Sequence, residues 1–227
     1  MDKLALWASI VAELKGSGYH AISLERGNNM QQRSILVTGC SSGIGRCTAL
    51  GLQQRGYRVF ATSRQQADID DLENLGICTL YLDYADSSSI HDAFNRVMKA
   101  TGGSLYALFN NGAYGQPGAV EDLTRDTLRS QFETNLFGWQ LTRLVTPVMR
   151  QQNEGRIIHN SSMLGFAAMS HRGAYNASKF ALEGLADTQR LELRGTNIHI
   201  SLIEPGPIRS RFRANAYQKF IENIDFE

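Results

Sequence analysis

A glycine-rich turn between an aliphatic run and an amphipathic run is the feature that most constrains this chain. Three glycines at spacings of four and two follow residues 34–37, and apolar residues at helical spacing begin after residue 46, which predicts a strand that turns into a helix. Glycine permits a tight turn and a close ligand, and a helix N-terminus favours pyrophosphate. The turn is a variant of G-x-G-x-x-G and predicts a dinucleotide site. Its candidate cofactor-binding residues are Gly39, Ser41, Ser42, Gly43, Ile44 and Gly45.

The same residues allow a second interpretation. Residues 39–43 also match the G-x-S-x-G nucleophile elbow of α/β-hydrolases. A hydrolase needs an acid and then a histidine downstream, but the last histidine, His199, lies in the alternating run 197–203, which is typical of a strand. The sequence thus lacks a suitably placed histidine to activate the serine, which disfavours a hydrolase.

The order of elements predicts the fold class. Strand patterns occur at residues 34–37, 58–62, 78–82, 105–110, 156–160 and 198–204, with helical patterns between them. A chain of 227 residues with this alternation predicts an α/β fold: one doubly wound Rossmann-type domain whose parallel sheet has helices on both faces. We expect residues 1–33 to be an N-terminal extension and residues 34–227 to be the dinucleotide-binding catalytic domain.

Composition excludes several classes of partner. A net charge of +1 without a block of like charges predicts no nucleic-acid partner, and the absence of an 18-residue apolar run predicts no membrane span. Cys40, Cys47 and Cys78 are odd in number and lack C-x-x-C spacing, so neither a disulfide framework nor a metal site is indicated. We expect them to be buried or half-buried and the protein to be cytoplasmic.

Residues after the second and third strands indicate the kind of dinucleotide. NAD sites usually place an acid after the second strand, but this chain has Thr62-Ser63-Arg64. Arg64 can bind a 2′-phosphate as a fork, which favours NADP(H) over NAD(H), although an isolated arginine here is equally typical of a solvated surface. Asp83 can accept from the adenine amino group or form a turn.

Two asparagine positions also stand out. Asn110 and Asn111 follow the fourth strand, where such residues support turns. Asn135 lies in the helical stretch 131–138, where asparagine is a poor interior residue. We therefore expect its side chain to have a compensating partner or task.

Tyr175 and Lys179 form the strongest chemical signal. Their i, i+4 spacing places a phenol and an ammonium on one helical face. A unit charge about 5 Å away contributes roughly 3 kcal/mol at an effective dielectric of 20, enough to lower a tyrosine pKa by about 2 units. Ser162 follows the fifth strand and can bond a substrate oxygen, although by the residues alone Ser161 serves as well, and both can be turn formers.

Taken together, these motifs resemble the short-chain dehydrogenase/reductase family over residues 34–212. The residues 40–42 and 61–64 look most like the branch of hydroxysteroid and retinol dehydrogenases and their bacterial relatives, which again points to NADP(H). The motifs that carry the resemblance are Thr38-Gly39-x-x-x-Gly43-x-Gly45, Asn110-Asn111, Asn135, Ser162, Tyr175-x-x-x-Lys179 and Pro205-Gly206.

The resemblance implies a role for each catalytic residue. Tyr175 is the general acid/base, Lys179 lowers its pKa and holds the nicotinamide ribose, Ser162 positions the carbonyl or alcohol oxygen, and Asn135 supports a water-linked proton path. It also implies a homodimer or homotetramer that pairs through the helices carrying Asn135 and Tyr175. Beyond the glycine turn, the expected cofactor-binding residues are Arg64, Asp83, Asn111, Tyr175, Lys179, Pro205 and Gly206.

The chain departs from the family pattern at two places. Asn110-Asn111-Gly112-Ala113 stands where the family has Asn-Asn-Ala-Gly, so we expect a slightly different backbone there. The family continues for several tens of residues beyond the position of Glu227, including a seventh strand. We therefore expect the C-terminal part to be truncated, with residues 208–224 beginning a substrate-covering helical region.

Apolar residues suggest the substrate. The loop 163–169, with Phe212, Tyr217 and Phe220, offers apolar walls without a charged clamp. This predicts a small hydrophobic carbonyl or alcohol substrate, although such residues are as often core or interface. The alternative function is a non-catalytic dinucleotide-binding or interaction protein.

Overall fold

A computed structural model describes residues 32–225 of the chain, so the predicted N-terminal extension lies almost wholly outside the described residues. The described part is a single α/β domain around a six-stranded parallel sheet in the order β3-β2-β1-β4-β5-β6. The strands are β1 (Ser34–Val37), β2 (Arg58–Ser63), β3 (Cys78–Tyr81), β4 (Ala107–Asn110), β5 (Gly155–Asn160) and β6 (Ile198–Ile203). All six strands occur where the sequence predicts them; the largest difference is the start of β4, two residues later than expected.

Helices cover both faces of the sheet because the strands are buried on both sides. In β1, Ile35 and Val37 pack in a cluster with α2 and α3, whereas Leu36 packs in a cluster with α4, α6 and α7. The main helices are α2 (Gly43–Gln54), α3 (Gln66–Asn74), α4 (Ser87–Thr101), α5 (Arg125–Phe132), α6 (Trp139–Gln152), α7 (Gly173–Glu192) and α8 (Phe212–Asn223). None of the helices in residues 32–225 is long and apolar enough to cross a bilayer.

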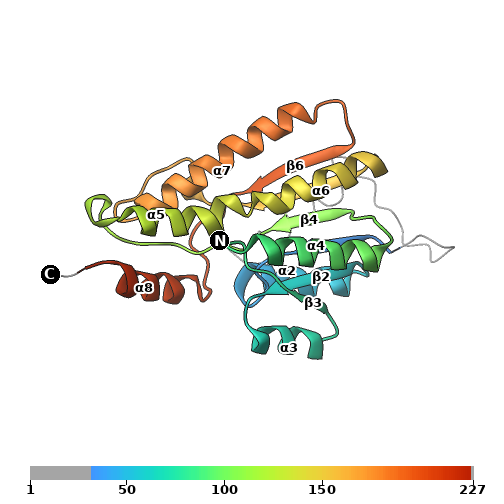
Figure 1. Ribbon diagram of the computed structural model, residues 1–227, viewed down its shortest axis with the longest axis horizontal. Helices are drawn as coiled ribbons and strands as arrows, with labels where there is room; N and C mark the ends of the chain where they lie inside the picture. Colours follow the sequence, from blue (N-terminus) through green and yellow to red (C-terminus); the bar gives the residue numbers. More distant parts are fainter. Residues whose placement is uncertain (1–31, 226–227) are drawn as a thin grey trace.

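The carboxyl ends of the strands form one edge of the molecule, which holds the predicted site. The strand order reverses between β1 and β4, and ligands of doubly wound sheets bind outside the carboxyl ends at this reversal. In Figure 1, α8 lies on the side toward which the strand arrows point. The glycine turn, the loop after β4 and α8 are therefore all placed at this edge.

The expectation that all three cysteines are buried or half-buried is wrong for Cys78. Cys78 begins β3, an edge strand of the sheet, and its side chain is exposed. An edge strand has a neighbour on one side only, so its first residue is less well covered. Cys40 is buried, and burial raises the pKa of its thiol to about 12.

Candidate active site

The glycine turn has the geometry of a cradle for a dinucleotide. Gly39 and Gly43 have φ angles of +65° and +58°, values that favour glycine. A Cβ added to Gly45 would lie 2.4 Å from the Gly39 oxygen, so the turn and the helix meet too closely for a side chain. Ser42 is the N-cap of α2, but its hydroxyl makes no capping bond, which leaves the first N–H groups of the helix for an anion. The cradle therefore fits a dinucleotide pyrophosphate.

Arg64 and Asp83, both predicted cofactor residues, lie side by side. The Arg64 Nη1 atom is 3.6 Å from Asp83 Oδ2, and the arginine side chain is 58% exposed. Asp83 also accepts a hydrogen bond from the Ala85 N–H at 3.0 Å, so the turn-forming role proposed for it is confirmed. Most of the Arg64 guanidinium is exposed to solvent and can still bind a phosphate.

Asn111 ties the loops at the site together. Its Nδ2 donates to the carbonyl oxygens of Thr38 and Gly39 at 2.9 and 3.1 Å, and its Oδ1 accepts from Asn160 Nδ2 at 2.9 Å. These bonds join the ends of β1, β4 and β5. Asn111 therefore holds the cradle in shape.

Tyr84 explains the departure from the family pattern at Gly112. A Cβ on Gly112 would lie 3.0 Å from the Tyr84 ring, and one on Gly138 would lie 2.6 Å from it. The ring thus occupies a slot between two glycines, and its hydroxyl lies 2.8 Å from Thr38 Oγ1. An alanine at residue 112, as in the family, would crowd this tyrosine.

The structure distinguishes the two serines after β5. The Ser162 hydroxyl lies beside the Tyr175 phenol and lowers the pKa of that tyrosine, and Ser162 Oγ accepts a hydrogen bond from the Leu164 N–H at 3.1 Å. The Ser161 hydroxyl instead faces the Glu183 carboxylate and lowers the pKa of that group, while its Oγ has no hydrogen-bond partner in the described chain. Of the two, Ser162 is the serine that lies beside the candidate general acid.

The electrostatics of Tyr175 differ from the expectation. Burial raises the pKa of Tyr175, and the nearby Ser162 hydroxyl acts in the opposite direction. Lys179 Nζ lies 5.7 Å from the centre of the Tyr175 ring. The expected net lowering of the tyrosine pKa is not found because loss of solvation of the phenolate is the larger effect. Tyr175 is therefore protonated at neutral pH, ready to donate a proton.

Lys179 is a buried cation held at the end of β5. Its side chain is 2% exposed, and Nζ donates to the Asn160 carbonyl oxygen at 2.7 Å. Burial lowers the pKa of Lys179 to about 8, and the charge of Glu183 opposes this change. Lys179 is therefore mostly an ammonium at pH 7, and it loses this proton as the pH rises through about 8.

Asn135 has the compensating partners that its position predicted. It lies in a π-helical turn, η2 (Glu133–Phe137), between α5 and α6, a feature that is frequent at functional sites. Its Nδ2 donates to the Tyr114 carbonyl oxygen at 2.9 Å and to Ser178 Oγ at 3.1 Å. Its Oδ1 accepts from the Tyr114 backbone N–H at 3.1 Å. These bonds join η2 to α7 and to the loop after β4.

The segment after β6 closes over the site. The Pro205 oxygen accepts from the Met163 N–H at 3.3 Å, and Gly206 lies beside the Met163 side chain. Further on, the Phe212 ring packs edge-on against Tyr175, with ring centres 5.6 Å apart. The helix expected in residues 208–224 is confirmed as α8.

Sequence reasoning missed Arg211. Its Nη2 donates to the Ser41 carbonyl oxygen at 2.6 Å and pairs with Asp68 Oδ1 at 3.2 Å. The signal in the sequence was a set of three arginines at alternate positions after Pro205-Gly206, Arg209, Arg211 and Arg213. Arg211 adds a second guanidinium beside the cradle and offsets the charge of Asp68.

His159 was also missed. It is 1% exposed in β5 and stacks on Trp139, with ring centres 4.7 Å apart and planes at 5°. Burial and the charges of Lys179 and Arg190 lower the pKa of His159 to about 3. The available signal was a histidine that directly follows the two isoleucines of β5, Ile157 and Ile158.

A doubly wound sheet, a dinucleotide cradle and a serine–tyrosine–lysine group define a nicotinamide-dependent oxidoreductase. The sequence model of short chain dehydrogenases matches residues 33–220, and the chain belongs to this family.

Three relatives illustrate the similarity. The chain is 42% identical over 190 residues to an uncharacterized oxidoreductase, YbbO, of Escherichia coli K12, a match that covers 83% of this chain and 71% of the relative. It is 33% identical over 198 residues to retinol dehydrogenase 8 of Bos taurus, over 82% of this chain and 62% of the relative. A crystal structure of an actinorhodin polyketide ketoreductase variant with NADPH superposes with a TM-score of 0.76 at 28% identity, over 82% and 75% of the two chains.

Proposed function

We propose that this protein is an NADP(H)-dependent oxidoreductase that interconverts a small hydrophobic carbonyl compound and its alcohol, with Tyr175 as the general acid/base. The observation that carries the proposal is the placement of the Ser162 hydroxyl beside the Tyr175 phenol, close enough to lower the pKa of that tyrosine, with Lys179 one turn further along α7 and its Nζ 5.7 Å from the centre of the tyrosine ring.

Each side chain has a distinct task in this reaction. The bound dinucleotide supplies or takes up the hydride. Ser162 donates a hydrogen bond to the substrate oxygen as charge develops on it. Tyr175, protonated at neutral pH, gives its proton to that oxygen in the direction of reduction, and its phenolate takes the proton back in oxidation. The Lys179 ammonium stabilises the phenolate.

Two arginines support the preference for NADP(H). Arg64 is largely exposed after β2, and Arg211 lies against the carbonyl of Ser41. The nearby acid Asp68 is paired with Arg211, so its charge is offset at the mouth of the cradle. The structure of the ketoreductase variant, which contains NADPH, also supports this assignment.

Exposed apolar side chains support a hydrophobic substrate. Phe166 and Met169 are 62% and 52% exposed in the loop between Ser162 and Tyr175, and Phe212 is 37% exposed beside the tyrosine ring. Burying them against a ligand is favourable by about 25 cal/mol per Å² of apolar surface. A bound apolar carbonyl compound would bury these side chains.

Turnover tests this function. The full-length protein with NADPH and a panel of aliphatic and aromatic aldehydes and ketones should consume NADPH, measured by absorbance. Tyr175→Phe should lower kcat by about 10²–10⁴-fold with NADPH affinity within a few-fold of the parent. Ser162→Ala should lower kcat by about 10²–10³-fold, while Ser161→Ala, the matched control, should stay within a few-fold.

Tight NADPH binding without turnover on any member of the panel would instead support the non-catalytic dinucleotide-binding alternative. The cofactor preference has a separate test, in which Arg64→Ala should weaken NADPH binding and leave NADH binding unchanged. Arg156→Ala, at the opposite edge of the sheet, serves as its control. Equal affinities of the parent protein for NADPH and NADH would contradict the preference.

The proposal extends to assembly and location. Phe137 in η2 and Phe180 in α7 are 52% and 47% exposed, which supports pairing of these elements in a homodimer or homotetramer. Light scattering should find a single oligomer that Phe180→Asp dissociates. Cys40 and Cys78 are free thiols, which supports a reducing cytoplasmic location, and fractionation of cells should recover the protein there.

A further inference from the structure

The segment between β6 and α8 lies against the glycine turn. A Cβ added to Gly43 would come within 3.0 Å of the Ser210 Cβ, so Ser210 packs on the turn. Arg211 follows as the N-cap of α8, and its Nη2 donates to the Ser41 carbonyl oxygen at 2.6 Å. The start of α8 is therefore in direct contact with the cradle for the dinucleotide.

Arg211 is on the adenosine side of this cradle. It pairs with Asp68 Oδ1 at 3.2 Å, and the other carboxylate oxygen of Asp68 accepts from Ser63 Oγ at 3.4 Å. Ser63 ends β2 and directly precedes Arg64. In doubly wound dinucleotide sites, an acid or an arginine near the end of the second strand contacts the 2′ position of the adenosine ribose. The Arg211 guanidinium thus lies next to the place expected for a 2′-phosphate.

The ion pair between Arg211 and Asp68 can exchange its partner. The two side chains are 56% and 23% exposed, and an exposed ion pair is weak. The contacts of Arg211 with Ser41 and Asp68 both use Nη2, whereas a guanidinium has five N–H donors in a planar fork. A phosphate ester carries more negative charge at pH 7 than a carboxylate. A phosphate at this position would therefore compete with Asp68 for the arginine.

The next residue in the chain reaches the reactive end of the site. Phe212 begins α8, and its ring packs edge-on against Tyr175, with ring centres 5.6 Å apart. On its other side, a Cβ added to Gly115 would lie 3.1 Å from Phe212 Cζ. Because Arg211 and Phe212 are adjacent in the chain, a ligand that fixes the arginine also restricts the phenylalanine.

We propose that Arg211 is a ligand of the 2′-phosphate of NADP(H), that it exchanges Asp68 for this phosphate, and that the exchange holds Phe212 against Tyr175. The inference rests on the proposed function, because it concerns the cofactor named there. Arg64 approaches the phosphate from the end of β2, and Arg211 approaches it from the segment after β6. One group of the cofactor would thereby connect the adenosine end of the cradle with the wall of the substrate site.

Calorimetric titration of the full-length protein with NADP⁺ and NAD⁺, which differ only in the 2′-phosphate, tests the ligand role. Arg211→Ala should weaken NADP⁺ binding by at least about tenfold and leave NAD⁺ binding within about twofold of the parent. Arg213→Ala removes the same charge from an exposed position on α8 and is the matched control, which should change neither affinity by more than about twofold. An equal loss for the two dinucleotides in Arg211→Ala would overturn the proposal.

A second variant distinguishes a phosphate ligand from a purely structural arginine. Asp68→Asn removes the competing carboxylate and its negative charge, so NADP⁺ binding should tighten by a few-fold. If the ion pair only holds the segment after β6 in place, Asp68→Asn and Arg211→Ala should both weaken NADP⁺ binding, and this outcome would contradict the exchange.

Hydrogen–deuterium exchange tests the connection to Phe212. The fragment 2′,5′-ADP lacks the nicotinamide half, yet it should slow amide exchange at the start of α8 in the parent protein and not in Arg211→Ala. Unchanged exchange in the parent would refute the connection. None of these measurements depends on turnover. A protein that prefers NADP⁺ but reduces no aldehyde or ketone would refute the proposed function alone, whereas a preference that survives in Arg211→Ala would refute the inference alone.

Discussion

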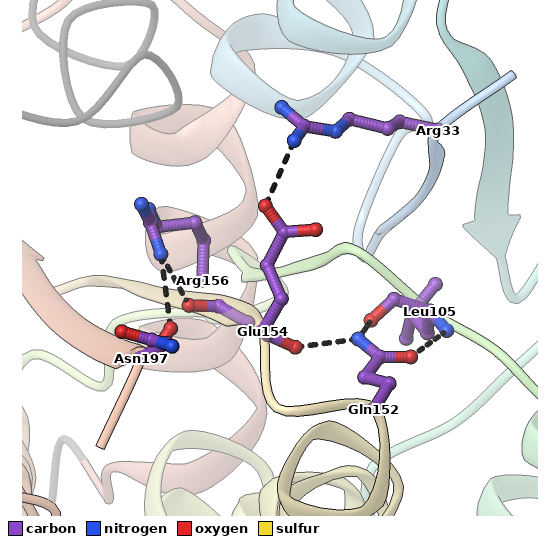
Figure 2. Close-up of polar contacts among 7 residues, drawn as sticks. Arg33, Leu105, Gln152, Glu154, Arg156 and Asn197 are labelled. Atoms are coloured by element: carbon purple, nitrogen blue, oxygen red, sulfur yellow. Dashed lines mark hydrogen bonds and ion pairs between the residues drawn. The ribbon is translucent and has the colours of Figure 1, made fainter. Parts of the chain in front are cut away.

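The two edges of the sheet treat their polar groups in opposite ways. At the amino-terminal edge, Gln152 donates to the carbonyl oxygens of Leu105 and Glu154 at 2.7 and 2.6 Å and accepts from the Leu105 N–H at 3.2 Å, and Arg33 pairs with Glu154 at 2.8 Å (Figure 2). At the carboxyl edge, His159 Nε2 and Asn160 Oδ1 are buried without a partner in the described chain.

The amino edge of the sheet therefore contributes mainly to stability, whereas the carboxyl edge carries the candidate functional site. At the amino edge, the side chains of Gln152 and Arg33 tie strands and loops together, and Arg156 similarly donates to the Asn197 carbonyl oxygen (Figure 2). At the carboxyl edge, groups left unpaired by the protein are available to ligands and water. Substitutions at the two edges should therefore affect different measurements.

The largest expected effect is at the cradle. Gly45→Ala would place a Cβ 2.4 Å from the Gly39 oxygen and 2.5 Å from Asn111 Nδ2, so the turn must open. NADPH affinity, measured by fluorescence titration, should fall by at least about 100-fold, or about 2.7 kcal/mol. Gly184→Ala on α7, where a Cβ meets nothing within 4 Å, should leave affinity unchanged. Equal affinities of the two variants would contradict the cradle.

The next effect is a dependence of stability on pH at His159. Its pKa is about 6.5 in the unfolded chain and is lowered to about 3 in the fold, so between these values the unfolded state binds the extra proton. Stability should fall as the pH drops below 6.5, by about 2 kcal/mol at pH 5 from this residue. Urea unfolding at pH 7.5 and 5.0 should show a smaller loss in His159→Gln; an equal loss would contradict the buried neutral ring.

A moderate effect is expected at the amino edge. Gln152→Ala removes three hydrogen bonds, which join Leu105, just before β4, to Glu154, just before β5. The free energy of unfolding should fall by about 1–3 kcal/mol, while NADPH affinity and kcat remain within about twofold. A large loss of affinity would show that the two edges are not independent.

The smallest effect is expected for the surface ion pair. Arg33 and Glu154 are 49% and 44% exposed, and such pairs contribute about 0–1 kcal/mol. Arg33 also lies over the Tyr106 ring, 4.2 Å from its centre, so Arg33→Ala loses a little more than the pair. Unfolding in low and high salt should show that the difference from the parent shrinks with salt; a salt-independent loss would assign it to the ring contact.

Local features of the chain determined the fold and much of the site. Aliphatic runs such as residues 34–37 predict buried strands, the glycines predict the turn to α2, and the i, i+4 spacing of Tyr175 and Lys179 places them on one face of α7. Each of these properties depends on residues within a few positions of one another, so periodicity and backbone geometry are enough to recognise them.

Contacts between distant segments were decided only by the tertiary structure. Ser162 rather than Ser161 meets Tyr175, Arg211 reaches the Ser41 oxygen 170 residues earlier in the chain, and His159 is held between Asn110 and Trp139. Burial, another tertiary property, reversed the expected direction of the Tyr175 pKa and left Cys78 exposed. Local spacing determines which residues share a face, whereas partners and solvation depend on how the faces pack.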